Sequence, residues 1–138
     1  MLVGSASADQ PVLQPGATST AGVVPVVITG NPQTCEELGC TGTAVKIDKS
    51  GETQTPDLYD GVYSLGSQTI TIDATTYNLI AWSATTRINC IYMKGANGGD
   101  LYSYCFDPPI SSDSGLTTPV NAAGTPADIS HIIICYTP

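Results

Sequence analysis

Cysteine is the residue type in this sequence whose spacing most directly suggests chemistry. Five cysteines occur in 138 residues, namely Cys35, Cys40, Cys90, Cys105 and Cys135. They do not fit a zinc site, because the closest pair is not C-x2-C and the chain has a single histidine. Disulfides explain the number better, and disulfides persist in oxidising compartments. We therefore expect an extracellular protein, either secreted or held at the cell surface.

A hairpin predicts the first disulfide. Two β-rich runs, residues 87–94 and 101–106, flank a glycine-rich loop, which is a strong hairpin signal. If the ends of the two runs face one another, Cys90 lies opposite Cys105, with Cβ atoms about 4.5–5.5 Å apart. We therefore predict a Cys90–Cys105 disulfide. A bulge in the loop would instead shift the register by one residue and place the two side chains on opposite faces.

Three cysteines remain after this assignment. A Cys35–Cys135 bridge closes a loop of roughly a hundred residues, which the chain-entropy treatment values at about 4–5 kcal/mol. A local Cys35–Cys40 bridge would stabilise the fold much less. We prefer Cys35–Cys135, which leaves Cys40 either as a buried free thiol or as a link between chains.

No combination of residues in the sequence indicates a catalytic centre, a cofactor or a metal. Ser130 adjoins the single histidine, His131, but adjacent strand residues point to opposite faces and cannot pair as nucleophile and base. We expect His131 to be structural, hydrogen-bonded near Trp82 or to a loop backbone. Five aspartates match no calcium-loop pattern and are expected to be solvated loop charges: Asp57, Asp60, Asp100, Asp107 and Asp113.

Three tyrosines of the predicted hairpin could bind a ligand. Tyr92, Tyr102 and Tyr104 could form an exposed aromatic stripe of the kind that stacks on sugars. Packing across the strands is the alternative that we favour.

Charge and length exclude several kinds of partner. Lys and Arg total 4 against 12 Asp and Glu, which gives a formal net charge of -8. Proteins that bind nucleic acid or an anionic membrane need a basic surface, so we expect neither partner. No apolar run approaches the ~20 residues that cross a bilayer, so we expect no membrane insertion. The length fits one domain.

Beyond residue 42 the sequence indicates β-strands. Residues 68–73 alternate, with Ile70 and Ile72 on one face. Residues 129–136 are apolar on both faces, which predicts a central strand. Residues 107–127, rich in Pro, Ser and Gly, are predicted to be a long connection. The other predicted strands are residues 44–48, 61–65, 77–82, 87–94 and 101–106.

Seven or eight short strands with regular turn signals indicate a sandwich or a barrel. We predict an all-β fold, a single antiparallel β-sandwich of immunoglobulin-like or prealbumin-like type, with an extended N-terminal arm. The arm covers residues 1–32, and the disulfide-bonded domain covers residues 33–138. One short helical turn is expected at residues 34–39, with Thr34 as its cap and Glu37 three residues further on.

Several motifs together resemble a known family. They are the Lys94-Gly95 hairpin, the Tyr102-Ser103-Tyr104 strand, the Gly-Leu-x-x-Pro-x-Asn loop at 115–121 and the Ser-His-Ile strand that ends at Cys135. This pattern, over roughly residues 33–136, resembles a Cys-bounded β-sandwich module of secreted and surface proteins of Gram-positive bacteria and some other microbes. The resemblance implies a β-sandwich, a Cys35–Cys135 pairing, an extracellular location and no known catalysis. Three cysteines depart from the pattern: Cys40, Cys90 and Cys105.

The arm holds a β-branched run at residues 23–29. Pro25 cannot donate a ladder hydrogen bond, so this run should form an edge strand or an added strand. We predict that it adds to an open sheet edge of a neighbouring copy; the alternative is that it folds back as the first strand of its own domain. The predicted assembly residues are Val23, Val24, Val26, Val27 and Ile28.

Donation from one copy to the next, without closure, builds a filament. The leading prediction is therefore a non-enzymatic extracellular structural protein, a self-assembling subunit of a surface filament or sheath. The alternative is a secreted adhesion module that binds carbohydrate or a surface protein. Ala6-Ser7-Ala8 has the pattern that ends a signal peptide, so residues 1–8 are either a signal remnant before a mature start at Asp9 or an ordinary leader of small residues.

Overall fold

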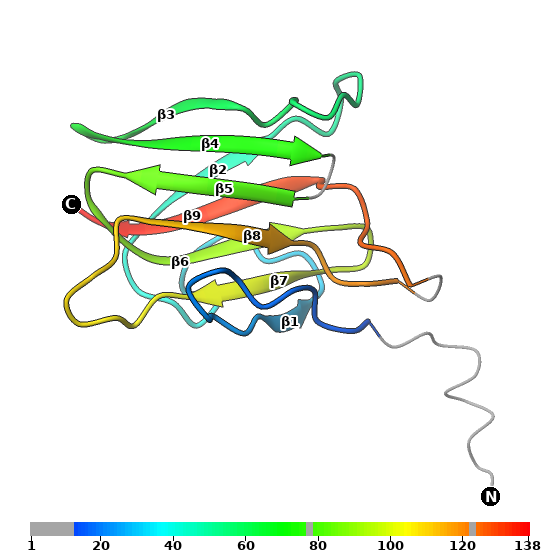
Figure 1. Ribbon diagram of the computed structural model, residues 1–138, viewed down its shortest axis with the longest axis horizontal. Coiled ribbons are helices and arrows are strands. Elements are labelled where there is room, and N and C mark those ends of the chain that lie inside the picture. The colour runs from blue at the N-terminus through cyan, green and yellow to red at the C-terminus, as the bar shows by residue number, and fades with distance from the viewer. Residues whose placement is uncertain (1–12, 77–78, 122–123) are drawn as a thin grey trace, which may run out of the picture.

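The computed structural model describes residues 13–76, 79–121 and 124–138 of the chain. Over these residues the fold has nine strands and no helix, in two antiparallel sheets that face one another (Figure 1). One sheet has the order β1-β7-β6-β9-β2, and the other has the order β3-β4-β5-β8. The strands are β1 (Val26–Thr29), β2 (Thr43–Asp48), β3 (Gly61–Leu65), β4 (Gln68–Thr76), β5 (Leu79–Ala84), β6 (Arg87–Lys94), β7 (Gly98–Ser103), β8 (Ser112–Thr117) and β9 (His131–Thr137). The prediction of an all-β sandwich is confirmed.

The main core lies between the two sheets. Ile70 and Ile72 of β4 enter it as the alternation predicts, and they belong to the same buried cluster as Ile132 and Ile134 of β9. Strand β9 pairs with β2 on one side and with β6 on the other, so the prediction of a central strand is confirmed. Its opposite face is also covered, because Ile133 belongs to a second buried cluster on the outer side of the five-stranded sheet.

The hairpin of β6 and β7 has a different register from the predicted one. Cys90 lies opposite Ser103, so Cys105 falls two residues beyond the predicted position. The strand begins at Gly98, inside the predicted loop, because Gly99 leaves room for the ring of Tyr92. A Cβ atom at Gly99 would lie 2.4 Å from Tyr92 Cζ. The predicted Cys90–Cys105 disulfide is therefore wrong.

Two disulfides join the start of the domain to its central strands. Cys35 bonds to Cys135, as predicted, with a Cα–Cα distance of 5.9 Å. Cys40 bonds to Cys90, so the prediction that Cys40 is free or links chains is wrong. The free cysteine is Cys105, which is exposed.

The predicted turn at residues 34–39 lies over the outer face of the five-stranded sheet, between these two disulfides. Glu37 N donates to Thr34 Oγ1 at 3.1 Å, as in a capping box, but the Glu37 carboxylate accepts from the N–H of Gln33, the residue before the cap, at 2.9 Å. Leu38 turns inward and joins the outer buried cluster. The two bridges fix this turn to β9 and β6, and the sulfurs of Cys40, Cys90 and Cys135 all lie within 4.8 Å of one another.

Strand β8 occupies part of the segment that the sequence predicts as a connection. It pairs with β5 as the edge of the four-stranded sheet, and the pairing is irregular between Ile80 and Trp82. Its sequence has no alternation of apolar and polar residues, and Gly115 has a φ of 80°, outside the usual range of a strand. The sequence alone therefore does not indicate this strand, which is recognised only from its pairing with β5. Tyr77 and Asn78 of the predicted strand at 77–82, and the signal-remnant question at residues 1–8, lie outside the described residues. Among the described residues, no helix is long and apolar enough to span a membrane.

Candidate functional site

The described part of the arm closes one side of the sandwich. Gln14 forms an isolated bridge with Val120, and Thr20 N donates to Ser114 O at 2.9 Å, so the segment follows β8 and its continuation. The chain then turns and returns as β1, which pairs with β7 from Val26↔Leu101 to Thr29↔Gly98 (Figure 1). The arm therefore supplies the edge strand β1 of the five-stranded sheet and also follows β8, the edge strand of the four-stranded sheet. In this single chain it packs on its own domain, which is the alternative arrangement that the sequence left open.

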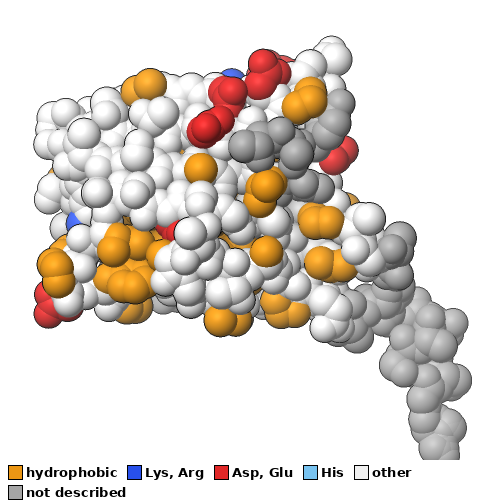
Figure 2. Space-filling view, viewed as in Figure 1, with side chains coloured by type: hydrophobic (Ala, Val, Ile, Leu, Met, Phe, Trp, Pro, Cys, Tyr) orange, Lys and Arg blue, Asp and Glu red, His pale blue; other side chains and the backbone are white. Residues whose placement is uncertain are grey.

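The predicted assembly residues divide between strand and turn. Val26, Val27 and Ile28 lie in β1, at the edge of the five-stranded sheet. Val23 is buried in the main core, whereas Val24 is 67% exposed in the preceding turn. This turn lies beside Cys105 and Phe106. Figure 2 shows hydrophobic side chains gathered at this end of the molecule, near the loop between β7 and β8.

The backbone of the arm approaches the domain closely at Gly16. Its N–H donates to Asp100 Oδ2 at 2.7 Å, and the next N–H, that of Ala17, donates to Thr117 Oγ1 at 2.9 Å. A Cβ atom at Gly16 would lie 2.0 Å from Thr117 Oγ1 and 2.5 Å from Asp100 Oδ2. Only glycine allows the arm to approach so closely.

Two tyrosines of the hairpin hold the arm by their hydroxyl groups. Tyr92 donates to Ile28 O at 2.8 Å, and Tyr102 donates to Ala17 O at 2.6 Å. The Tyr102 hydroxyl also accepts a hydrogen bond from Thr117 N at 3.0 Å. Both tyrosines are fully buried, and burial raises the pKa of Tyr92 to about 12. The exposed stripe that could stack on sugars is therefore not formed.

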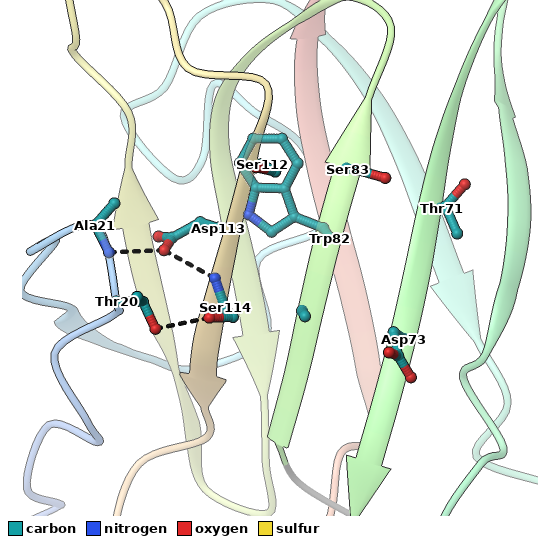
Figure 3. Close-up of a pocket in the computed structure, with 10 residues that line it drawn as sticks. Thr20, Ala21, Thr71, Asp73, Trp82, Ser83, Ser112, Asp113 and Ser114 are labelled. Carbon is teal, nitrogen blue, oxygen red and sulfur yellow. Dashed lines mark hydrogen bonds between the residues drawn. The ribbon is translucent and has the colours of Figure 1, made fainter.

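The third tyrosine, Tyr104, belongs to a buried network at Asp113. Trp82 Nε1 donates to the Tyr104 hydroxyl at 3.0 Å, and this hydroxyl donates to Asp113 Oδ2 at 2.9 Å. The other carboxylate oxygen accepts from Ala21 N and Ser114 N, both at 2.8 Å (Figure 3). Desolvation raises the pKa of Tyr104. Asp113 is thus a buried acceptor for the arm, and its prediction as a solvated charge is wrong.

Asp100 is also buried, in β7, so its prediction as a solvated loop charge is wrong. Its side chain is 0% exposed, and Oδ1 has no hydrogen-bond partner among the described residues. Burial raises the pKa of this carboxyl to about 6, against a small opposite effect of the hydrogen bond from Gly16 N. Asp57, Asp60 and Asp107 are exposed, as predicted.

The single histidine faces the outer side of the five-stranded sheet. His131 is buried, and its ring lies 6.3 Å from the ring of Tyr92, so the predicted place near Trp82 in the main core is wrong. Burial lowers the pKa of His131, and its Nε2 has no partner among the described residues. The Ser130 hydroxyl donates to Gly95 O at 3.1 Å, away from the imidazole.

A shallow groove of about 540 Å³ crosses the outer face of β4, β5 and β8 where the arm meets β8 (Figure 3). Small hydroxyl groups and one exposed carboxylate, that of Asp73, supply its polar atoms. The hydroxyl residues are Thr20, Thr71, Ser83, Ser112 and Ser114. Such a surface can form hydrogen bonds but offers no exposed aromatic ring for stacking.

Comparison with known proteins returns no match among protein-family models, curated proteins or solved structures. The resemblance to the Cys-bounded module of secreted microbial proteins therefore stays a prediction. The site that the structure itself brings together is the contact of the arm with β7, the strand next to β1, and with β8, the edge strand of the four-stranded sheet.

Proposed function

We propose that this protein is an extracellular structural subunit that assembles by passing its arm to a neighbouring copy. The contact at β7 and β8 carries the proposal, because the arm supplies the partners of buried polar groups in the domain. Asp100, Asp113 and Tyr102 each bond to a backbone group of the arm. A second copy has the same arm, so it can supply the same partners, which is the basis of exchange between identical chains.

The position of Cys35 supports exchange. The chain leaves β1 at Gly30, whose φ is 85°. A Cβ at Gly30 would meet no atom of the described residues within 4 Å. Five residues later the Cys35–Cys135 disulfide fixes the chain to the central strand β9. Residues before Cys35 can therefore leave the domain while the two-disulfide framework after it stays closed.

The charge of the arm also supports contact between copies. The whole chain has a formal net charge of -8, which makes identical surfaces repel. From Gln10 to Cys35, however, the sequence has no charged residue. Natural edge strands often carry charges that prevent pairing with other chains, and β1 has none.

The two disulfides are compatible with an oxidising, extracellular location. We propose that the protein is secreted or held at the cell surface, where its assembly would form a filament or sheath.

Cross-linking between differently marked copies tests the exchange. Ala17 and Thr117 make contact, so we would place Ala17→Cys in one copy and Thr117→Cys in another, both with Cys105→Ser. Mild oxidation of the mixture should give a disulfide between the two chains if arms are exchanged. Electron microscopy of the unmodified protein should then show fibres.

A matched control replaces Thr117→Cys by Ser64→Cys, an exposed position on β3 at the far edge of the four-stranded sheet. This pair should give no specific link. A chain that carries both Ala17→Cys and Thr117→Cys reports the contact within one copy. Exchange is refuted if this chain forms the disulfide internally, whereas the mixture of the two singly substituted copies forms no link between chains at any protein concentration that allows assembly.

A second candidate function is adhesion, favoured by the groove on β4, β5 and β8. Its hydroxyl groups and Asp73 could bind a polar ligand such as a carbohydrate. Asp73→Ala should then abolish binding on a glycan array, whereas Asp57→Ala, at an exposed acidic residue outside the groove, should not. Equal signals from these two variants would remove this candidate.

A further inference from the structure

The free cysteine shares a surface pocket with one end of a disulfide. The pocket has a volume of about 530 Å³, and its lining includes Cys40 and Cys105. Cys105 is exposed and Cys40 is half-buried, whereas Cys90 is fully buried. The sulfur that is open to attack in the Cys40–Cys90 disulfide is therefore that of Cys40.

The strand register places the thiol on the same face as the disulfide. Cys90 lies opposite Ser103, and the pairing continues for one more residue, since Tyr104 N donates to Asn89 O at 2.9 Å. Cys105 therefore lies two residues beyond Ser103, the residue opposite Cys90, and lines the same pocket as Cys40. A disulfide needs Cα atoms within about 7 Å, so the Cys40–Cys105 bond requires Cys105 to approach Cys40. Cys105 follows the end of β7, so this movement can be confined to the loop before β8.

We propose that Cys105 and the Cys40–Cys90 disulfide form a thiol–disulfide exchange site within one chain. The Cys105 thiolate attacks Cys40 Sγ, so that a Cys40–Cys105 bond forms and the Cys40–Cys90 bond breaks. Cys90 leaves as a thiolate and takes up a proton in place of the one that Cys105 released. The step therefore consumes no oxidant or reductant, and it is independent of the proposed assembly.

The exchange would change how the turn at residues 34–39 is attached. In the observed form Cys40 holds the end of this turn to the central strand β6. In the exchanged form Cys40 is bonded to the loop that follows the strand β7. The Cys35–Cys135 disulfide, which fixes the other end of the turn, is unchanged by this step.

Mapping the free thiol tests the proposal. The full chain is incubated near pH 8 without added thiol or disulfide, samples are quenched by acid and alkylated, and peptides are mapped by mass spectrometry without reduction. At the start, the label should be on Cys105 alone. With time, label should appear on Cys90 together with a Cys40–Cys105 linked peptide, and its rate should not depend on protein concentration.

A matched control keeps five cysteines but moves the free thiol. The variant Cys105→Ser with Ser83→Cys has an exposed thiol on the other sheet, outside the pocket, and should keep its Cys40–Cys90 bond. The proposal is overturned if wild-type label stays on Cys105 alone while the Cys40–Cys90 peptide persists. It is equally overturned if exchange is as fast in the control, or if the new bond links two chains at a rate that rises with protein concentration.

Discussion

Asp100 gives the sharpest prediction, which concerns the pH dependence of folding. Its carboxyl has a pKa of about 6 in the folded protein against an ordinary value of 3.8, because burial disfavours the charge. Well below pH 3.8 both folded and unfolded chains carry the proton, and the stability associated with the neutral carboxyl is fully present. This stability is lost as the pH rises through about 6, and the difference between the two pKa values corresponds to about 3 kcal/mol.

The variant Asp100→Asn removes this titration and keeps a carbonyl oxygen that can accept from Gly16 N. Relative to the variant, the wild-type free energy of unfolding should therefore fall by about 3 kcal/mol between about pH 3.5 and pH 7. Urea unfolding can be followed by the fluorescence of Trp82, the single tryptophan, which is buried in the main core. Other carboxyls titrate equally in both proteins and cancel in the difference.

The comparison with Asp73→Asn provides the control, because Asp73 is exposed on the outer face of β4. That variant should follow the wild-type pH profile. A constant stability difference between wild type and Asp100→Asn over the whole pH range would refute the argument that the folded protein holds a destabilised charge at this position.

Three further predictions concern the arm, the core and the framework. Gly16→Val should detach the arm, because the Cβ of the valine would overlap Thr117 Oγ1. Limited proteolysis of the variant should then cleave the chain before residue 30, and a cleavage pattern identical to that of the wild type would contradict this. Ile134→Ala should lower the free energy of unfolding by about 2–5 kcal/mol, because the side chain is fully buried between the sheets; a loss under about 1 kcal/mol in urea unfolding would contradict it. The double variant Cys35→Ser with Cys135→Ser should lose about 4–5 kcal/mol, since this bridge closes a long loop, and calorimetry showing an unchanged melting temperature would refute that estimate.

Local sequence patterns predict the central strands well. Residues 87–94 are predicted as a strand and form β6 with the same bounds, because apolar and β-branched residues there coincide with burial on both faces. The register of the β6–β7 hairpin is harder to predict from local sequence patterns. The stretch 95–100 contains three glycines, and the sequence does not say that Gly99 must enter the strand to make room for Tyr92. The observed register, which a side chain at position 99 would obstruct, places Cys105 two residues away from the position opposite Cys90.

The candidate site is harder to predict because its contacts join residues far apart in the sequence. Gly16 and Asp100 are 84 residues apart, and neither residue type suggests the other. The signal that could have found the site is the group of hairpin tyrosines, whose hydroxyl groups need partners when buried. Tyr92 and Tyr102 donate to backbone carbonyl oxygens of the arm. Every residue has such a carbonyl, so the side chains of the arm do not reveal which residues accept these bonds.

The bridge that follows the arm also determines how the molecule would respond to tension. A force applied at the start of the described arm would peel its residues from β7 and β8 in turn, until Cys35 stops the extension. About 22 residues at about 3.3–3.6 Å each would release roughly 75 Å of chain. The load would then pass through a covalent bond into β9, a strand paired on both sides. A single-molecule pulling trace should show one short extension before the domain itself yields.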